Sequence, residues 1–318
     1  MKQKTEPIRQ ELLRYLDAEH IHSDCSMKQY TTMRVGGPAA LLLTPGSAAE
    51  LFGALEVIEA NGIPCVIMGN GSNLIFDDEG FDGVVVQIGR GLDHVRIEGN
   101  IVFVEAGALL TTVARAASES GLTGMEFACG IPGSVGGAVY MNGGAYGGEM
   151  SQIVHSVSSI SRTGIMKDRP GSELGFSYRK SIFQENGETI LGVKLLLAQG
   201  DPRMIQEKTR DYTQRRTTRQ PLQFPSSGSF FRRPAGHFAG GLIEEAGLKG
   251  LSCGGARVSE LHAGFIINTG EAKASDIVDL MRIIQETVLF RTGVLLEPEV
   301  RIVSKDGSSQ HFDQKDGS

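Results

Sequence analysis

The stretch GLTGMEFACGIPGSVGGAVYMNGGAYGG, residues 121 to 148, decides how the rest of the chain is interpreted. It holds ten glycines in 28 positions, and its one charged residue is Glu126. Glycine loses more backbone entropy on ordering than any other residue and has no side chain to pack, so this composition argues against a helix interior or an ordinary strand. We therefore expect a loop that another group approaches closely.

Two interpretations of this loop compete. Successive glycine N–H groups can converge on the phosphate oxygens of an anionic cofactor, because no Cβ atom stands in the way. The alternative is a flexible linker, which would be rich in serine, proline or charge. The stretch instead contains seven residues of the kind that pack: Met125, Phe127, Ile131, Val135, Val139, Tyr140 and Met141. This composition favours a packed, ligand-binding loop.

The amino-acid composition limits the classes of protein to which this chain can belong. The chain has 318 residues, of which 40% are hydrophobic and 21% charged, as expected of a soluble protein with two or three domains. The net charge of −6 gives no support to a nucleic-acid partner, whose usual footprint is a basic surface. Small anionic substrates remain possible, because basic residues can cluster locally on an acidic protein.

The cysteines and the first residues indicate the compartment. Cys25, Cys65, Cys129 and Cys253 form no CxxC pair and no zinc-type cluster, so we expect reduced thiols and no metal. The start, MKQKTEPIRQELLRYL, lacks an apolar signal core, and no apolar run reaches the ~18 residues of a membrane span. We expect a cytoplasmic protein that does not contact a membrane.

Local patterns predict several elements. The segment GNGSNLIF (69–76) follows a buried strand, where α/β folds place ligands, but Leu74 stands where a dinucleotide fingerprint needs glycine. The bare Gly-x-Gly turn is equally consistent with a tight structural turn. The other expected elements are a helix over 7–19, a helix to Ala60 with Ser47 and Glu50 as its capping box, a helix over 109–120 ended by Gly121, a helix capped by Ser275 and ended by Gly293, and a last strand over 294–303.

Seven motifs follow one another in the order and spacing of one family. They are YTTMRVGGPA, GNGSNLIF, GIPGSVGGAVYMNGGAYG, SYRKSIF, PSSGSFFRRP, AGLKG and LEPEVRIV. Together they resemble the UDP-N-acetylenolpyruvoylglucosamine reductases, also called UDP-N-acetylmuramate dehydrogenases or MurB. The resemblance covers residues 30–303, nearly the whole chain.

The resemblance implies an α+β fold. An N-terminal helix and lead-in (1–29) would precede an FAD-binding domain (30–216) of the two-lobed vanillyl-alcohol-oxidase, or PCMH, type, with lobes over 30–88 and 89–216. A smaller C-terminal α/β domain (217–303) would bind substrate, and residues 304–318 would be a disordered tail.

The resemblance also implies a reaction of peptidoglycan precursor synthesis. In this family NADPH reduces a non-covalently bound FAD, and the flavin passes hydride to UDP-N-acetylglucosamine enolpyruvate, giving UDP-N-acetylmuramate. Hydride addition to the terminal carbon of the alkene builds negative charge onto the conjugated carboxylate, and the neighbouring carbon then needs a proton. Such an enzyme is expected to act as a monomer on these small molecules; the sequence does not distinguish NADPH from NADH.

Three residues match the family's catalytic positions. Arg179 in SYRKS would hold the carboxylate, Ser229 in SSGSFF would donate the proton, and Glu299 in LEPEVR matches the glutamate, with Glu297 as an alternative. Without the resemblance, these residues would read as a surface arginine, a turn hydroxyl and a solvated carboxylate on an edge strand beside Pro298.

The resemblance places the FAD pyrophosphate on two glycine-rich segments. The residues implied are Gly69, Asn70, Gly71, Ser72, Asn73, Gly130, Ile131, Pro132, Gly133, Ser134, Gly136 and Gly137. Arg34 could add charge near the cofactor or form a structural salt bridge, and Asn142 and Tyr146 are weaker candidates. For the UDP-sugar, five arginines occur within 19 residues, from Arg215 to Arg233. The substrate candidates are Tyr178, Arg216, Arg233 and His262.

The absence of one loop indicates which branch of the family the chain resembles. After SYRKSIF the sequence passes directly to a strand and a helix, without the extra loop that carries a tyrosine over the substrate in one branch of the family. The chain therefore resembles the shorter branch. Two other functions remain open: another FAD-dependent oxidase or dehydrogenase of the same fold, and a non-catalytic module that binds nucleotide sugars.

Overall fold

The computed structural model describes residues 2–307, and its chain divides into two compact units. The first unit comprises the chain up to Ser23, Leu41–Asn70 and Val84–Thr218. The second comprises Asp24–Ala40, Gly71–Gly83 and the chain from Arg219 onward. Gly71–Gly83 and most of Asp24–Ala40 lie inside the sequence range expected for the FAD-binding domain (30–216), and the last change of unit follows Thr218.

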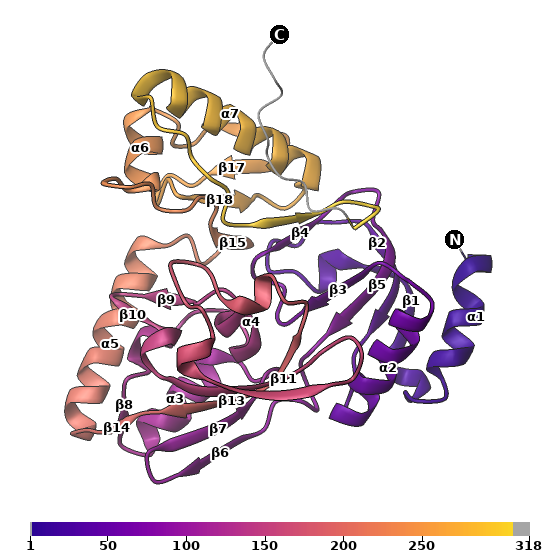
Figure 1. The fold of residues 1–318 in the computed structure, drawn as a ribbon. Helices are drawn as coiled ribbons and strands as arrows, with labels where there is room; N and C mark the ends of the chain where they lie inside the picture. The colour runs from indigo at the N-terminus through magenta and orange to yellow at the C-terminus, as the bar shows by residue number, and fades with distance from the viewer. Residues whose placement is uncertain (1, 308–318) are drawn as a thin grey trace. The chain divides into compact units, whose positions relative to one another are not determined.

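The chain begins with helices and a four-stranded sheet (Figure 1). The sheet has the order β1-β2-β5-β3, and β3 runs parallel to β5 with Cys65 opposite Val84. The elements are α1 (Lys2–Leu12), β1 (Ile21–Ser26), β2 (Pro38–Leu43), α2 (Ala48–Ala60), β3 (Cys65–Met68) and β5 (Phe81–Gln87).

Two of the predicted helices lie in this region. Helix α1 begins before residue 7 and ends at Leu12, so the expected range 7–19 was wrong: Pro7 lies inside the helix, and extended backbone at Asp17 (φ −61°, ψ 145°) prevents its continuation. The start of α2 is confirmed, because the Ser47 hydroxyl accepts a hydrogen bond from Glu50 N–H at 3.2 Å. The Glu50 carboxylate accepts from Gly46 N–H instead of closing the capping box on Ser47.

The rest of the first unit is built on a five-stranded sheet of order β12-β11-β13-β7-β6 (Figure 1). All four pairings are antiparallel. The elements are β6 (Val95–Glu98), β7 (Ile101–Glu105), α3 (Leu110–Glu119), α4 (Val135–Tyr140), β11 (Val154–Ile160), β12 (Met166–Pro170), β13 (Thr189–Leu196) and α5 (Pro202–Arg219). Their apolar faces form one core with α2 and β3.

The glycine-rich stretch is ordered and partly helical, which corrects the expectation of a loop throughout. Gly121 ends α3 with a φ of +70°, as predicted, but α4 then places Gly136 and Gly137 inside a helix. The reason is a close approach: a Cβ at Gly136 would lie 2.9 Å from Ala106 Cβ, just beyond β7. Glycine here lets a helix pack directly on the end of a strand.

The second unit has its own core, centred on residues such as Phe230, Ile243, Leu280 and Ile284. Its sheet has the order β15-β18-β17-β16, and two helices pack with it (Figure 1). A separate parallel pair joins β4 to β19, with Leu74 opposite Arg301. The elements are β4 (Leu74–Phe76), β15 (Ser226–Ser229), α6 (Ala239–Glu245), β16 (Ser252–Cys253), β17 (Ala256–Val258), β18 (Phe265–Asn268), α7 (Ala274–Thr292) and β19 (Arg301–Val303).

The sequence predicted the C-terminal end of α7 correctly but not its N-cap. Gly293 ends it in the left-handed conformation (φ +71°), as expected, but its N-cap is Lys273 rather than Ser275. Asp78 takes over the capping role from elsewhere in the chain: it accepts from Ala274 N–H at 2.8 Å and from Ser275 N–H at 2.9 Å. Burial opposes ionisation of Asp78, yet the bonds from Ser275 and Ala274 hold its pKa below the usual value. A distant carboxylate thus caps the first N–H groups of the helix, while the local Asp276 accepts from Lys273 N–H at 2.9 Å.

The final strand is shorter than expected. Only Arg301–Val303 is regular strand, and the range 294–303 was therefore too long. Pro298 interrupts the pattern because it has no N–H to donate, although it still bridges Phe231. Of the tail expected over 304–318, residues 308–318 lie outside the described part of the chain, while Lys305 C=O accepts a hydrogen bond from Asp82 N–H at 2.8 Å.

Among the described residues, no helix is long and apolar enough to cross a membrane. All four cysteines are free thiols. Burial raises the pKa of the Cys65 thiol to about 12, so this cysteine is an unreactive part of the core.

Candidate active site

Two of the glycine-rich segments predicted to bind FAD meet within the first unit. The Asn70 side-chain amide donates to Pro132 C=O at 2.6 Å. A Cβ at Gly69 would overlap the Ser134 hydroxyl, so only glycine permits this approach. Segment 69–70 and segment 130–137, far apart in sequence, therefore form one surface of backbone and small polar groups.

Ser134 organises the second of these segments. It is the N-cap of α4, is 2% exposed, and accepts a hydrogen bond from Gly137 N–H at 3.3 Å. On the preceding side, Gly133 C=O accepts from Leu110 N–H at 3.0 Å, which joins the loop to the start of α3. The conformation of residues 133–137 is thus fixed on both sides.

Helix α5 lines the glycine-rich stretch with polar and aromatic side chains. Arg216 donates to Gly130 C=O at 2.6 Å, and Tyr212 stacks on Tyr146 with ring centroids 4.6 Å apart. Lys208, on the same side of the helix, lies 3.4 Å from the buried carboxylate of Glu126. Arg216, predicted to bind substrate, therefore contacts the backbone of the segment predicted to bind FAD.

Arg179 lies in a tight turn of the first unit. Ser177 and Lys180 exchange two backbone hydrogen bonds of 3.2 and 3.1 Å, which leaves Tyr178 and Arg179 at the corner. Arg179 has a φ of +57°, a conformation that normally selects glycine. Its guanidinium lies over the Tyr178 ring, 5.3 Å from the centroid. Strained backbone of this kind is enriched at functional sites, although it also occurs elsewhere in this chain, as at Asp24.

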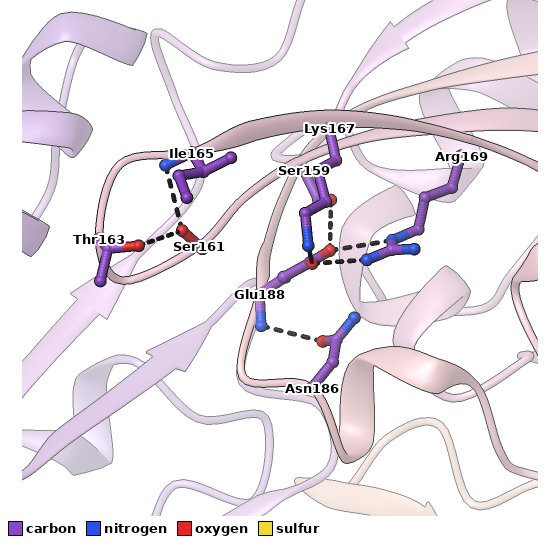
Figure 2. Close-up of polar contacts among 8 residues, drawn as sticks. All are labelled: Ser159, Ser161, Thr163, Ile165, Lys167, Arg169, Asn186 and Glu188. Carbon is purple, nitrogen blue, oxygen red and sulfur yellow. Dashed lines mark hydrogen bonds and ion pairs between the residues drawn. The ribbon is translucent and has the colours of Figure 1, made fainter.

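The two ends of the loop that carries Arg179 are joined by ion pairs around the buried carboxylate of Glu188 (Figure 2). Glu188, just before β13, accepts two hydrogen bonds from Arg169 on β12 (3.1 and 2.7 Å), one from Lys167 at 3.0 Å and one from Ser159 at 2.8 Å. The bonds from Arg169 in particular lower the pKa of Glu188 to about 2. The carboxylate therefore stays ionised and closes the loop at its base.

Ser229 lies in the second unit at the end of β15. It pairs with Phe265 on β18 after an irregularity in which Gly228 has a φ of +78°. Its hydroxyl donates to Phe231 C=O at 3.2 Å. The neighbouring hydroxyls differ: Ser226 donates to Ile266 C=O at 2.8 Å, and the buried Ser227 hydroxyl has no hydrogen-bond partner within residues 2–307.

Glu299 lies beside the Ser229 segment in the same unit. Its N–H donates to Phe230 C=O at 2.8 Å, and its C=O accepts from the Asn73 side chain at 3.0 Å. Glu297 differs, because its side chain is 71% exposed and lies 3.9 Å from Arg232. The structure therefore brings together Asn73, Ser229 and Glu299, and it makes Glu299 the less exposed of the two glutamates.

The remaining cofactor candidates of the second unit are Gly71, Ser72 and Arg34, and Thr32 connects Gly71 to β15. Thr32 N–H donates to Gly71 C=O at 3.1 Å, and its hydroxyl donates to Ser226 C=O at 2.8 Å. Arg34 is exposed and, like Arg179, has a positive φ, of +57°. Gly71 also has a positive φ (+61°), and Ser72 is half-buried beside it. Thr32 was not predicted as part of the site, because nothing local marks it.

The substrate candidates have different surroundings. His262 is half-buried, and burial lowers its pKa; its Nδ1 accepts from Gly264 N–H at 3.1 Å. A Cβ at Gly264 would lie 3.5 Å from the Ser229 hydroxyl oxygen, so His262 and Ser229 flank one glycine. Arg233 is exposed and lies over the Phe238 ring, 4.6 Å from its centroid.

Comparison with known families assigns both parts of the chain. An FAD binding domain model matches residues 39–168, and a model described as "UDP-N-acetylenolpyruvoylglucosamine reductase, C-terminal domain" matches residues 220–303. The first match contains segments 69–73 and 130–137, and the second contains Ser229 and Glu299. The expected α+β fold, a PCMH-type FAD-binding domain followed by a smaller C-terminal domain, is confirmed.

Relatives that align with most of the chain belong to the same family as the C-terminal domain model. The UDP-N-acetylenolpyruvoylglucosamine reductase of Clostridium novyi is 46% identical over 302 residues, covering 95% of this chain and 98% of the relative. That of Latilactobacillus sakei is 46% identical over 279 residues, covering 88% and 92%. The solved structure of MurB from Thermus caldophilus matches with a TM-score of 0.77 and 36% identity, covering 87% of this chain and 97% of that one. The chain therefore belongs to the UDP-N-acetylenolpyruvoylglucosamine reductase (MurB) family of FAD-binding oxidoreductases.

Proposed function

We propose that this protein reduces UDP-N-acetylglucosamine enolpyruvate to UDP-N-acetylmuramate with electrons from NADPH, carried by a non-covalently bound FAD. The observation that carries the proposal is similarity along the whole length: 95% of this chain aligns with 98% of a reductase of that name. The chemistry that FAD would supply when bound is the transfer of hydride between NADPH and the terminal carbon of the enolpyruvyl group.

The glycine-rich segments suit the cofactor. The overlap that any side chain at Gly69 would have with Ser134 supports a surface where backbone must come close to a ligand. A diphosphate fits such a surface, because convergent N–H groups can meet its oxygens. Gly69 to Asn73, Gly130 to Ser134, Gly136 and Gly137 would hold it, and Arg34 would add positive charge.

Three side chains of this chain would serve the chemistry. Arg179 would contact the substrate carboxylate with its guanidinium fork and stabilise the charge that develops there. Ser229 would donate the proton to the carbon beside the carboxylate, which requires that the carbanion be a strong base at contact distance. Glu299 would be the third catalytic group. Tyr178, Arg216, Arg233 and His262 are the candidates for binding the UDP-sugar.

We further propose an FAD-binding domain over 30–216, a substrate-binding domain over 217–303, a monomer as the active form and the cytoplasm as its compartment. The two family models, 39–168 and 220–303, fall inside these ranges. Four free thiols suit a reducing compartment.

The test is product formation by purified protein. The protein should be yellow, should release its flavin into the supernatant on acid precipitation, and should convert the enolpyruvyl sugar into a product that has gained one hydride and one proton, with one NADPH consumed per product. Flavin that stays with the precipitated protein, together with preferential transfer of electrons to O₂, would identify an oxidase of the same fold. Tight binding of the UDP-sugar with no NADPH oxidation would identify a binding module.

A further inference from the structure

The Arg179 turn is held from outside by side chains. The backbone of the turn supplies two bonds between Ser177 and Lys180, and its corner residue has a φ of +57°. A non-glycine residue keeps such a conformation only when its surroundings impose it. The contacts of the turn with the rest of the first unit therefore determine where Arg179 points.

Gln184 makes one of these contacts. Its side-chain amide donates to Arg179 C=O at 2.9 Å and to Tyr140 C=O at 2.9 Å. Tyr140 ends α4, and the last carbonyls of a helix lack partners within the helix. Tyr140 C=O also accepts from the Ser181 hydroxyl at 2.7 Å. One amide thus ties the backbone of Arg179 to the end of the helix that follows the glycine-rich loop.

Asn142 makes a second contact, with the first residue of the turn. Its amide donates to Ser177 C=O at 3.0 Å, and its side-chain oxygen accepts from Ser151 N–H at 2.9 Å. Asn142 is 1% exposed and has a φ of +43°, a conformation that asparagine tolerates better than most residues. Its side chain is therefore itself fixed, and it can fix the turn.

We propose that Gln184 and Asn142 are positioning residues for Arg179, which lock the strained turn onto the end of α4 and so aim the guanidinium. The inference rests on the proposed catalytic role of Arg179. Neither residue needs to touch substrate. Because stabilisation of developing charge depends on geometry, a displacement of about 1 Å can cost about 100-fold in rate.

The test is a double-mutant cycle on the FAD-loaded enzyme. The flavin is reduced anaerobically with NADPH, and its reoxidation by the enolpyruvyl sugar is followed in the wild type, Gln184→Met, Arg179→Ala and the double variant. We expect Gln184→Met to slow reoxidation about 10- to 100-fold and to leave reduction by NADPH and the flavin spectrum unchanged. In the Arg179→Ala background it should change nothing further, because the group it aims is gone.

Gln199→Met is the matched control: the same substitution at an exposed glutamine on β14 (Ala198–Gln199), expected to leave both half-reactions unchanged. Asn142→Gly, which accepts the positive φ but removes both side-chain bonds, repeats the cycle and is expected to behave as Gln184→Met does. Equal slowing in both backgrounds would overturn the proposal, since Gln184 would then act independently of Arg179. Normal reoxidation in Gln184→Met would also overturn the proposal. Loss of folding or of bound FAD in both Gln184→Met and Asn142→Gly would do the same. Normal reoxidation in Arg179→Ala is a different result, which refutes the proposed role of Arg179 itself.

Discussion

Arg179 and the pair Ser229 and Glu299 are held in place by different means. Arg179 sits in a strained turn whose outside contacts include side-chain amides, from Gln184 and Asn142. In the second unit, backbone bonds join the segments of Ser229 and Glu299 to each other and to the residues around β18, and side-chain bonds from Asn73 and Thr32 add to them. Phe230 N–H donates to Gly264 C=O at 3.0 Å, and Glu299 N–H donates to Phe230 C=O at 2.8 Å.

Because the two positions are held differently, they should be sensitive to different substitutions. A backbone ladder forms with many sequences, so the place of Ser229 should survive substitution of its neighbours. A turn fixed by side-chain amides depends on the identity of those side chains, so Arg179 should be lost to substitutions that never touch it. The predictions that follow probe this contrast.

The largest effect is expected for Ser229→Ala. Loss of a positioned proton donor should slow reoxidation of the reduced flavin by the enolpyruvyl sugar about 10²- to 10⁴-fold, while reduction by NADPH stays near normal. Rapid mixing measures the two half-reactions separately. Ser227→Ala is the matched control, because its buried hydroxyl has no partner within the described residues and its removal should cost nothing. Equal loss of both half-reactions would make Ser229 a structural residue.

Arg179→Gly should separate stability from activity. Glycine relieves the left-handed backbone at φ +57°, so we expect the free energy of unfolding to stay level or rise by up to about 1 kcal/mol. Reoxidation by the sugar should nevertheless fall about 100-fold or more, because the charge that stabilises the carboxylate is gone. Denaturant unfolding and the reoxidation rate are measured on the same preparation. A variant that is strongly destabilised would show that Arg179 is mainly a structural residue of the turn.

Glu188→Gln tests the base of the Arg179 loop (Figure 2). Losing the carboxylate should cost about 2 kcal/mol of unfolding free energy at pH 7, since Arg169 and Lys167 lose their ionic partner. The folded-state pKa, about 2, lies below the unfolded value, so this stabilisation is present above about pH 5 and is lost as pH falls towards 2. Unfolding curves of wild type and variant should therefore converge in acid. A difference that does not vary between pH 7 and 3 would contradict this assignment.

Thr32→Val gives the smallest expected effect. It removes the side-chain bond to Ser226 C=O but leaves the pairing of β15 with β18 intact. We expect a loss of stability of about 1 kcal/mol and a change in reoxidation of less than about fivefold. If Thr32→Val slowed reoxidation as much as Gln184→Met, the contrast between the two regions would be wrong.

Part of the fold could be predicted from the sequence, because it depends on residues that are close together in the chain. The cap at Ser47 and the helix-ending glycines Gly121 and Gly293 were predicted because each depends on residues within one turn of helix. Helix α4 and the capping of α7 by Asp78 were not, because Ala106 and Asp78 act from distant parts of the chain. The same holds for the site. Motifs named Arg179, Ser229 and Glu299, whereas the contacts of Gln184 and Asn142 exist only in the folded structure.

The function proposed for this chain is hydride transfer from NADPH through FAD to an enolpyruvyl UDP-sugar. Its most direct test is to reduce the purified enzyme anaerobically with one equivalent of NADPH, mix it with UDP-N-acetylglucosamine enolpyruvate, and follow the flavin absorbance. We expect bleaching of the flavin by NADPH, then rapid return of the oxidised spectrum with UDP-N-acetylmuramate formed in equal amount. Flavin that stays reduced until O₂ is admitted would contradict this proposal.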